Sequence, residues 1–165
     1  MTLQTLFGTN VTAPQKIQFK QIKAVYETLY ISEEVTGYLQ PGQRYTAPQQ
    51  VYDCFKFLME ETKEMFMCLH LDGKNRIIAV DLVSIGSLNQ SIVHPREVYK
   101  TALLSNAAAL ILIHQHPTGD PTPSSEDIAI TRRLKEAGDI LGLKVLDHII
   151  IGDGEYLSFV ERGLL

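Results

Sequence analysis

The sequence predicts an α/β protein of the α+β type, in which a mixed, largely antiparallel sheet carries helices on its faces. Apolar stretches typical of strands alternate along the chain with stretches of helical periodicity. Turn signals join neighbouring strands as hairpins, which favours antiparallel pairing over a doubly wound parallel sheet. The 165 residues, 45% hydrophobic and 21% charged, have the composition of one globular core. We expect residues 1–45 to form an N-terminal arm and residues 46–165 to form the main domain.

The arm is expected to contain one extended strand. Residues 1–16 show few periodic apolar positions, whereas apolar side chains alternate from Lys16 to Tyr30 with one irregularity. Residues 37–42 form a turn region before the main domain. We therefore expect this strand to pair onto a sheet.

A first helix is predicted over residues 46–61. Thr46 is the expected N-cap, because a threonine side chain accepts a hydrogen bond from a backbone N–H of the first turn. Val51, Phe55 and Leu58 recur at helical spacing and form one buried stripe.

A β-hairpin and a second helix follow. Residues 64–71 are a short apolar strand, residues 72–75 are a reverse-turn signal, and residues 76–84 are the partner strand. Pro95 stands where a proline is tolerated at a helix start, and the apolar spacing after it predicts a helix over residues 95–105.

The C-terminal part is predicted to hold a central strand, a third helix and a final hairpin. The continuous apolar run 107–113 is typical of a strand that is covered on both faces. A third helix opens at Ser124 and is capped by Gly142. Residues 143–151 and 156–160 then form the last hairpin.

Three residues at and after the end of the central strand form a candidate metal site. His114 and His116 stand two apart on an extended backbone, so both imidazoles point to one side while Gln115 points to the other. A loop rich in proline and glycine ends the strand, and Asp127 follows in the first turn of the next helix. Two neutral imidazoles and one carboxylate around Zn²⁺ leave a fourth position for water, which is the arrangement of a catalytic site. The pattern predicts one zinc ion per chain and hydrolytic chemistry.

A hydrolase of this kind also needs a base that takes the proton of the metal-activated water. The sequence offers several carboxylates, among them Glu60, Glu61, Glu64 and Glu97. Their spacing alone does not choose among them.

The motif HxHP followed by SxxD matches the JAMM signature of the JAB/MPN metalloprotease fold, and the chain resembles the RadC-like JAB-domain proteins of bacteria. The matching stretches are HPREV (94–98), HQHPTG (114–119), PSSED (123–127), Thr131 with Arg133-Leu134, LDHIIIGDG (146–154), and the closing Tyr156-Leu-Ser-Phe and Gly163-Leu-Leu. Many relatives read HNHPSG where this chain reads HQHPTG, a difference that leaves the ligand set intact.

The resemblance implies a JAB/MPN fold of cytidine-deaminase-like architecture and a zinc metalloprotease that cleaves a peptide or isopeptide bond in a protein or peptide substrate. It implies that Glu64, two residues before Phe66, is the catalytic base. It also implies that Ser124, the serine of SxxD, helps to bind the developing oxyanion. Ser124 is equally suited to capping a helix, and both roles can hold at once.

A binding module is the alternative function. It would be a non-catalytic member of the same family, which carries a DNA-repair label, and would act in DNA metabolism or on a mobile element. Full-length RadC proteins have a DNA-associated helix-hairpin-helix region, whereas residues 1–45 are short and strand-like, so we expect a short form. The formal net charge of −4 gives no general attraction to a phosphate backbone. The ligand set favours the enzyme, because scaffolds of this fold usually lack it.

We expect a cytoplasmic protein. Cys54 and Cys68 are interpreted as reduced core thiols. The longest apolar run has seven residues, too few to cross a membrane, and the N-terminus lacks the pattern of a secretory signal.

The remaining histidines are given structural interpretations. His94 is expected to cap the second helix, with a role facing the site as the alternative. His70 shares a strand face with Cys68 and is expected to pack in the core, and His148 is expected to be buried and hydrogen-bonded. The charged residues Arg132, Arg133, Lys135 and Glu136 are expected to form a solvated helix face, although its basic members could touch a phosphate.

Overall fold

The computed structural model describes residues 25–27, 42–86 and 93–165. Its elements are α1 (Pro48–Phe55), the 3-10 helix η3 (Lys56–Glu60), β1 (Met65–Leu71), β2 (Ile77–Ile85), α2 (Pro95–Leu104), β3 (Ala109–Gln115), α3 (Ser125–Leu141), β4 (Lys144–Ile151) and β5 (Tyr156–Ser158). The strand predicted within residues 16–30 lies outside the described residues except at 25–27, which belong to neither a helix nor a strand.

The five strands form one mixed sheet in the order β2-β1-β3-β4-β5. β1 runs antiparallel to β2 and to β3, β4 runs antiparallel to β5, and β3 and β4 are parallel. The parallel pair is connected through α3, since parallel neighbours need a crossover. The predicted fold class, a mixed and largely antiparallel sheet with helices on its faces, is confirmed.

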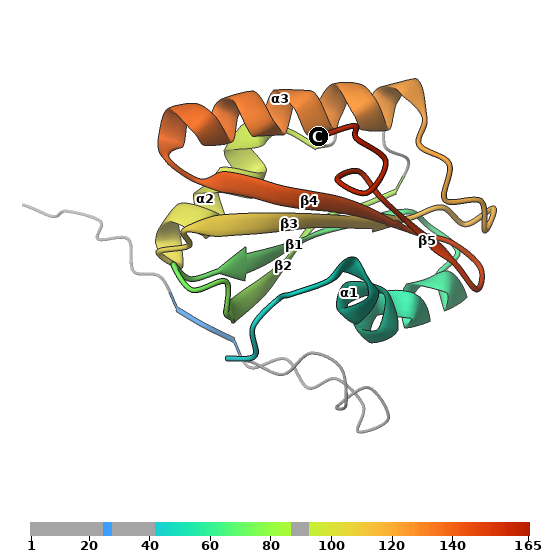
Figure 1. Ribbon diagram of the computed structural model, residues 1–165, viewed down its shortest axis with the longest axis horizontal. Coiled ribbons are helices and arrows are strands. Elements are labelled where there is room, and N and C mark those ends of the chain that lie inside the picture. The colour runs from blue at the N-terminus through green and yellow to red at the C-terminus, as the bar shows by residue number, and fades with distance from the viewer. Residues whose placement is uncertain (1–24, 28–41, 87–92) are drawn as a thin grey trace, which may run out of the picture.

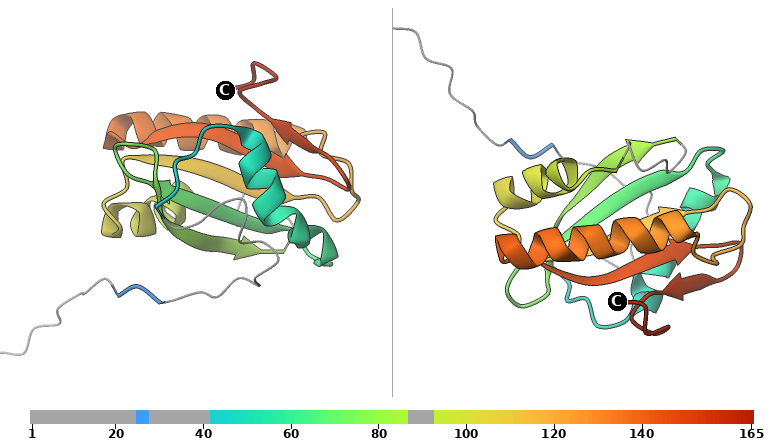
Figure 2. Two further views of the ribbon diagram at one scale, coloured as in Figure 1. Left: turned by 60° about the horizontal axis from the view of Figure 1, so that its bottom comes forward. Right: turned by 90° about the horizontal axis from the view of Figure 1, so that it is seen from above.

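Helices cover both faces of this sheet (Figures 1 and 2). α1 packs on one face against apolar side chains of β1, β3 and β4, while α2 and α3 pack on the opposite face. All seven residues of β3 are buried, because the strand is central and covered on both sides. This burial on both faces explains why the sequence is continuously apolar over residues 109–113.

The first helix is shorter than predicted, and its N-cap is not Thr46. The residue before a proline is pushed into the extended region, so Ala47 (φ −155°, ψ 147°) is the N-cap and the helix begins at Pro48. The Gln50 side chain accepts hydrogen bonds from the backbone N–H groups of Thr46 at 2.8 Å and Ala47 at 3.2 Å. The α-helix ends at Phe55 and continues as the 3-10 helix η3, where the sequence predicted one unbroken helix.

Both other helices carry the predicted caps. His94 Nδ1 accepts a hydrogen bond from the Arg96 N–H at 3.2 Å, so the capping interpretation of His94 is confirmed. The Ser124 hydroxyl accepts from the Asp127 N–H at 3.1 Å at the start of α3. Gly142 ends α3 in the left-handed region (φ 74°), which glycine adopts without a Cβ penalty.

The two cysteines, Cys54 and Cys68, are buried and unpaired, as predicted. Burial raises the pKa of the Cys54 thiol to about 11 and that of Cys68 further, so both are protonated at neutral pH. In the part of the chain that the structure describes, no helix combines the length and the apolarity that crossing a bilayer requires.

Candidate metal centre

The structure brings the three predicted ligands together at the end of β3. His114 Nε2 lies 3.0 Å from His116 Nε2 and 3.2 Å from Asp127 Oδ1, and His116 Nε2 lies 3.3 Å from Asp127 Oδ2. His114 and Asp127 are buried, whereas the His116 side chain is 14% exposed. The cluster is therefore closed toward the core and open on the side of His116.

The loop between His116 and Asp127 is held by backbone hydrogen bonds and close packing. The Gly119 N–H donates to the carbonyl of His116 at 2.9 Å, and the Gly119 carbonyl accepts from the Asp153 N–H at 2.9 Å. Gly152 packs so closely that a Cβ there would lie 2.6 Å from the Gly119 carbonyl oxygen. The turn between β4 and β5 thus holds the loop in place.

The His116 ring is oriented by the same loop. Its Nδ1 lies 2.7 Å from the carbonyl oxygen of Asp120, and because a carbonyl can only accept, Nδ1 carries the hydrogen. In the neutral ring, Nε2 therefore presents a lone pair toward His114 and Asp127.

The two oxygens of the Asp127 carboxylate have different surroundings. Oδ2 accepts hydrogen bonds from the Ser124 N–H at 2.8 Å and the Ser124 hydroxyl at 2.6 Å. Oδ1 is buried and has no hydrogen-bond partner among the described residues, although His114 Nε2 is 3.2 Å away. A buried acceptor left without a donor, next to two imidazole nitrogens, fits a bound cation.

The pKa values of the cluster follow from this arrangement. Burial opposes the charge on Asp127, but the interactions with His114 and His116 outweigh it and hold the pKa of Asp127 well below its ordinary value. Burial lowers the pKa of His114, whereas the interaction with Asp127 raises the pKa of the more exposed His116. The site thus combines a carboxylate that is ionised at neutral pH with one ring that burial favours as neutral.

Glu64 stands beside this cluster, at the entry to β1. The antiparallel β1–β3 ladder ends at the pair of Phe66 with His114, two residues after Glu64. Glu64 is half-buried, and its negative charge adds to the raised pKa of His116 and opposes the lowering of the His114 pKa by burial. Of the other carboxylates that the sequence left open, Glu60 and Glu61 are exposed, and Glu97 pairs with Lys100 at 2.7 Å on α2.

Gln115, which points to the opposite side of β3, ties down the backbone around Glu64. Its amide nitrogen donates to the Lys63 carbonyl at 2.5 Å, and its amide oxygen accepts from the Met65 N–H at 2.8 Å. Gln115 is fully buried. The sequence indicated its direction but not this contact, because the neighbour of β3 in the sheet was unknown.

His148 is the residue near the site that sequence reasoning missed. The prediction that it is buried and hydrogen-bonded is confirmed, but its partner is a predicted ligand: His148 Nε2 lies 2.8 Å from His114 Nδ1. Its Nδ1 lies 2.5 Å from the Thr131 hydroxyl. The missing information was the parallel pairing of β3 with β4, which no local pattern contains.

His70 lies elsewhere, in the core, as predicted. It is 2% exposed, and its Nδ1 is 2.9 Å from the Ser105 hydroxyl. Among the described residues, the group that can hold a metal ion consists of His114, His116 and Asp127, without His70 or Cys68.

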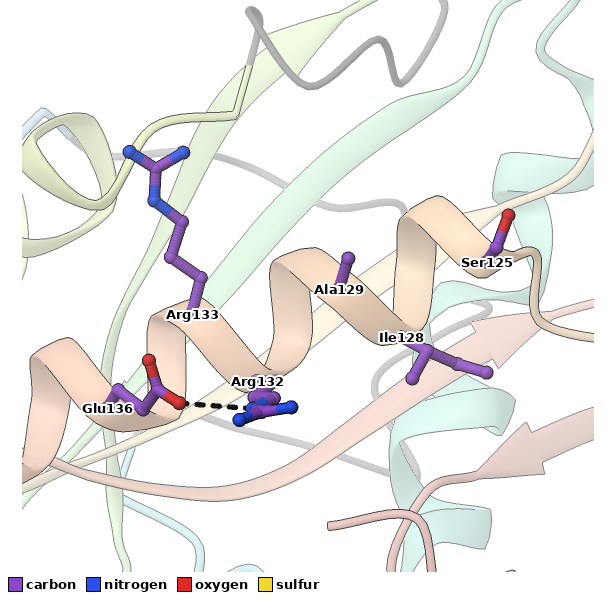
Figure 3. A pocket seen from close by; sticks show the side chains of 6 residues that line it. All are labelled: Ser125, Ile128, Ala129, Arg132, Arg133 and Glu136. Carbon is purple, nitrogen blue, oxygen red and sulfur yellow. Dashed lines mark hydrogen bonds and ion pairs between the residues drawn. The ribbon is translucent and has the colours of Figure 1, made fainter.

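A shallow depression of about 450 Å³ lies on the outer face of α3 (Figure 3). It is lined by Ser125, Ile128, Ala129, Arg132, Arg133 and Glu136. Arg132 pairs with Glu136 at 3.1 Å, and both side chains are mostly exposed. This face matches the solvated charged face that the sequence predicted, and none of the three candidate ligands lines it.

Comparison with known proteins finds a matching family and several similar proteins. A family model described as RadC-like JAB domain matches residues 45–164. A UPF0758 protein of Pelobacter propionicus is 68% identical over 77% of this chain and 56% of its own length, and one of Geotalea uraniireducens is 63% identical over 74% and 54%. A UPF0758 protein of Methanosarcina acetivorans is 47% identical over 95% of this chain and 68% of its own length. The chain thus spans little more than half the length of the first two relatives.

Proposed function

The chain belongs to the RadC-like JAB domain family, and from this premise we propose that it is a zinc-dependent hydrolase that cleaves a peptide or isopeptide bond. The observation that carries the proposal is the convergence of His114, His116 and Asp127 around a carboxylate oxygen for which the described part of the chain provides no hydrogen-bond donor. The relatives' printed names state no activity, so the substrate, a protein or peptide, is also part of the proposal.

Zinc is the proposed ion because of the donor set. Two imidazole nitrogens and one carboxylate oxygen suit zinc, whereas magnesium and calcium prefer oxygen donors throughout. Three protein ligands are the number typical of a catalytic zinc site. When bound, zinc supplies a Lewis acid that lowers the pKa of a water molecule to about 7 and polarises a carbonyl group.

Glu64 is the proposed general base. Its carboxylate would take a proton from the attacking water and pass it to the departing amine. Its position at the entry to β1, where its charge acts on both histidines, supports this role. Gln115 holds the backbone on either side of Glu64, which limits the movement of the carboxylate.

Ser124 is proposed to assist at the oxyanion, in addition to its observed role as the N-cap of α3. Its hydroxyl proton is donated to Asp127 Oδ2 at 2.6 Å. A rotation about its Cβ–Oγ bond would redirect that proton to a substrate oxygen, where a hydrogen-bond donor stabilises developing negative charge, while Oγ still accepts from the Asp127 N–H.

Metal analysis tests the site. Protein purified without chelator is expected to carry about one zinc ion per chain, and His116→Ala is expected to lose it. Less than about half an equivalent of zinc in the wild-type protein, unchanged in His116→Ala, would contradict the proposal.

A hydrolysis assay tests the base and separates the enzyme from the alternative binding module. With a library of fluorogenic peptides and lysine isopeptides, Glu64→Gln is expected to keep its zinc and to lose about 10²- to 10⁴-fold in rate. A zinc-loaded wild-type protein that cleaves no member, yet binds DNA tightly and in a salt-sensitive way that persists in Glu64→Gln, would favour the module.

The cytoplasm is the proposed location. Two buried, unpaired thiols support it, because free cysteines are usual in a reducing compartment.

A further inference from the structure

The inner side of the metal centre contains a chain of three short hydrogen bonds. It begins at His114 Nδ1, 2.8 Å from His148 Nε2, and continues from His148 Nδ1 to the Thr131 hydroxyl at 2.5 Å. It ends where the Thr131 hydroxyl meets the backbone carbonyl of Asp127 at 2.6 Å. This series of hydrogen bonds links β3, β4 and α3, and it joins two of the three candidate ligands.

The direction of every proton in this chain is set at its end. A carbonyl oxygen can only accept, so at 2.6 Å the single hydroxyl hydrogen of Thr131 must lie between the two oxygens. The Thr131 oxygen therefore presents a lone pair to His148, and His148 Nδ1 carries the hydrogen.

Neutral His148 in turn sets which ring nitrogen of His114 carries the hydrogen. His148 is fully buried, with the rings of Phe66 and Phe159 centred 5.5 Å and 4.8 Å away. Among the described residues, its two ring nitrogens contact His114 and Thr131 and no carboxylate, since the Asp147 carboxylate accepts from its backbone N–H rather than from its ring. A charged imidazole without a paired anion is costly in such surroundings. With hydrogen on Nδ1, neutral His148 has a bare Nε2, which accepts from the Nδ1–H of His114.

We infer that His148 and Thr131 are positioning residues that keep His114 in the Nδ1–H tautomer, with the Nε2 lone pair aimed at the metal. The inference rests on the proposed metal site. His116 reaches the same state through a local carbonyl, that of Asp120, so the two histidine ligands are oriented by independent means. Outer contacts of this kind fix ring orientation and raise ligand basicity.

The test uses two variants, one rescue and one control. Thr131→Val removes the hydroxyl at nearly constant volume, and His148→Phe keeps an aromatic ring between Phe66 and Phe159 but removes the acceptor. His148→Gln restores an amide oxygen that can accept from His114. Thr101→Val is the matched control, because the Thr101 hydroxyl also contacts a helix carbonyl, that of Val98 at 3.2 Å, and an acidic side chain away from the metal centre.

Zinc affinity, measured by competition with a chromophoric chelator, is the first readout. Thr131→Val and His148→Phe are expected to bind zinc about 10- to 100-fold more weakly, and His148→Gln is expected to recover most of the loss. Thr101→Val is expected to match the wild-type protein. Unchanged affinity in folded Thr131→Val would overturn the inference, and this nearly isosteric variant keeps the test valid if His148→Phe does not fold.

Imidazole ¹⁵N NMR of the metal-free protein at about pH 8 is the second readout, and it is independent of metal binding. The wild-type protein is expected to show His114 and His148 as Nδ1–H tautomers, and Thr131→Val is expected to show His148 as a mixture. A wild-type spectrum with His114 as the Nε2–H tautomer would overturn the inference. A wild-type protein that shows the expected tautomers but binds no zinc would instead refute the proposed function.

Discussion

Asp127 contributes both to the start of α3 and to the candidate metal centre. Its Oδ2 accepts two hydrogen bonds from Ser124, while its buried Oδ1 faces the histidines and has no donor within residues 25–27, 42–86 and 93–165. Burying a carboxylate oxygen without a hydrogen bond costs free energy, and a cation bound to that oxygen would offset the cost. One side chain thus positions the N-terminus of α3 and provides a ligand.

Asp127→Asn is expected to separate these two functions. The amide keeps an oxygen that can accept from the Ser124 N–H, but the ligand charge is lost, so zinc affinity is expected to fall by more than the roughly 10- to 100-fold typical of an outer contact. Competition with a chelator measures this. Asp120→Asn is the matched control, since its exposed carboxylate contacts the Thr122 N–H while its carbonyl, which orients His116, is retained. Equal affinities in the two variants would refute the role of Asp127.

Gln115→Met is expected to destabilise the protein by about 1–3 kcal/mol, because the Lys63 carbonyl and the Met65 N–H lose their buried partner. Urea unfolding measures the loss. Gln49→Met, in which an exposed contact with Asp53 is removed, is expected to change stability by less than about 0.5 kcal/mol. If Glu64 is the base, the rate of hydrolysis in Gln115→Met is expected to fall more than zinc affinity does. An unaltered rate would speak against a role of Gln115 in positioning Glu64.

Among the elements, the pairing of β3 with its two neighbours builds the site. β1 carries Glu64 to the histidines, and parallel β4 carries His148 behind His114. The β4–β5 turn then holds the loop from which His116 takes its carbonyl partner. The geometry of the ligands therefore depends on elements that contribute no ligand.

Gly152→Ala is expected to damage the site from this turn. The new Cβ would lie 2.6 Å from the Gly119 carbonyl oxygen and 2.7 Å from Pro121 Cδ, so the loop must move. Overpacking of this kind costs about 1–3 kcal/mol, and zinc affinity is expected to fall with it. Denaturant unfolding and zinc titration measure both effects. Gly73→Ala, where no atom lies within 4 Å of the new Cβ, is expected to retain wild-type zinc affinity, and the same result for Gly152→Ala would contradict the argument.

At the scale of the whole molecule, metal binding and folding are expected to be coupled, because the ligands come from two elements on either side of a loop. Zinc at about 100 times its dissociation constant is expected to stabilise the fold by about 2.7 kcal/mol. Thermal unfolding with and without zinc measures this. His116→Ala should show no comparable shift, and an equal shift in that variant would place the ion elsewhere.

The pH dependence of stability in the metal-free protein follows from the buried histidines. Burial lowers the pKa of His114 and of His148, so below about pH 6.5 the unfolded chain binds protons that the folded chain does not. The free energy of unfolding is then expected to fall as pH decreases, by about 1.4 kcal/mol per pH unit for each such proton. His116 has a raised pKa, so the stability that its charged form contributes is present at lower pH and is lost as pH rises through that pKa.

Urea unfolding between about pH 5 and 7, in the presence of a chelator, measures how the free energy of unfolding changes with pH. His148→Phe is expected to make this pH dependence less steep, and an equally steep dependence would count against a buried neutral His148.

Much of the fold was predictable because its signals are local. The apolar run of β3, the turn between β1 and β2, and the caps at Ser124 and Gly142 each depend on a few neighbouring residues. The N-cap of α1 was predicted one residue too early, because the restriction that Pro48 places on Ala47 outweighs the capping preference of Thr46. The break into η3 has no equally local signal.

The sequence by itself determined the spacing of His114, His116 and Asp127, since the alternation of a strand and the first turn of a helix are properties of a short stretch of backbone. The tertiary structure alone decided what stands around them. The contacts of Glu64, Gln115 and His148 with the end of β3 depend on which strands are neighbours, and strand order is set by packing both sheet faces at once. Such pairings join residues 34 to 52 positions apart, a distance at which neither periodicity nor capping carries information.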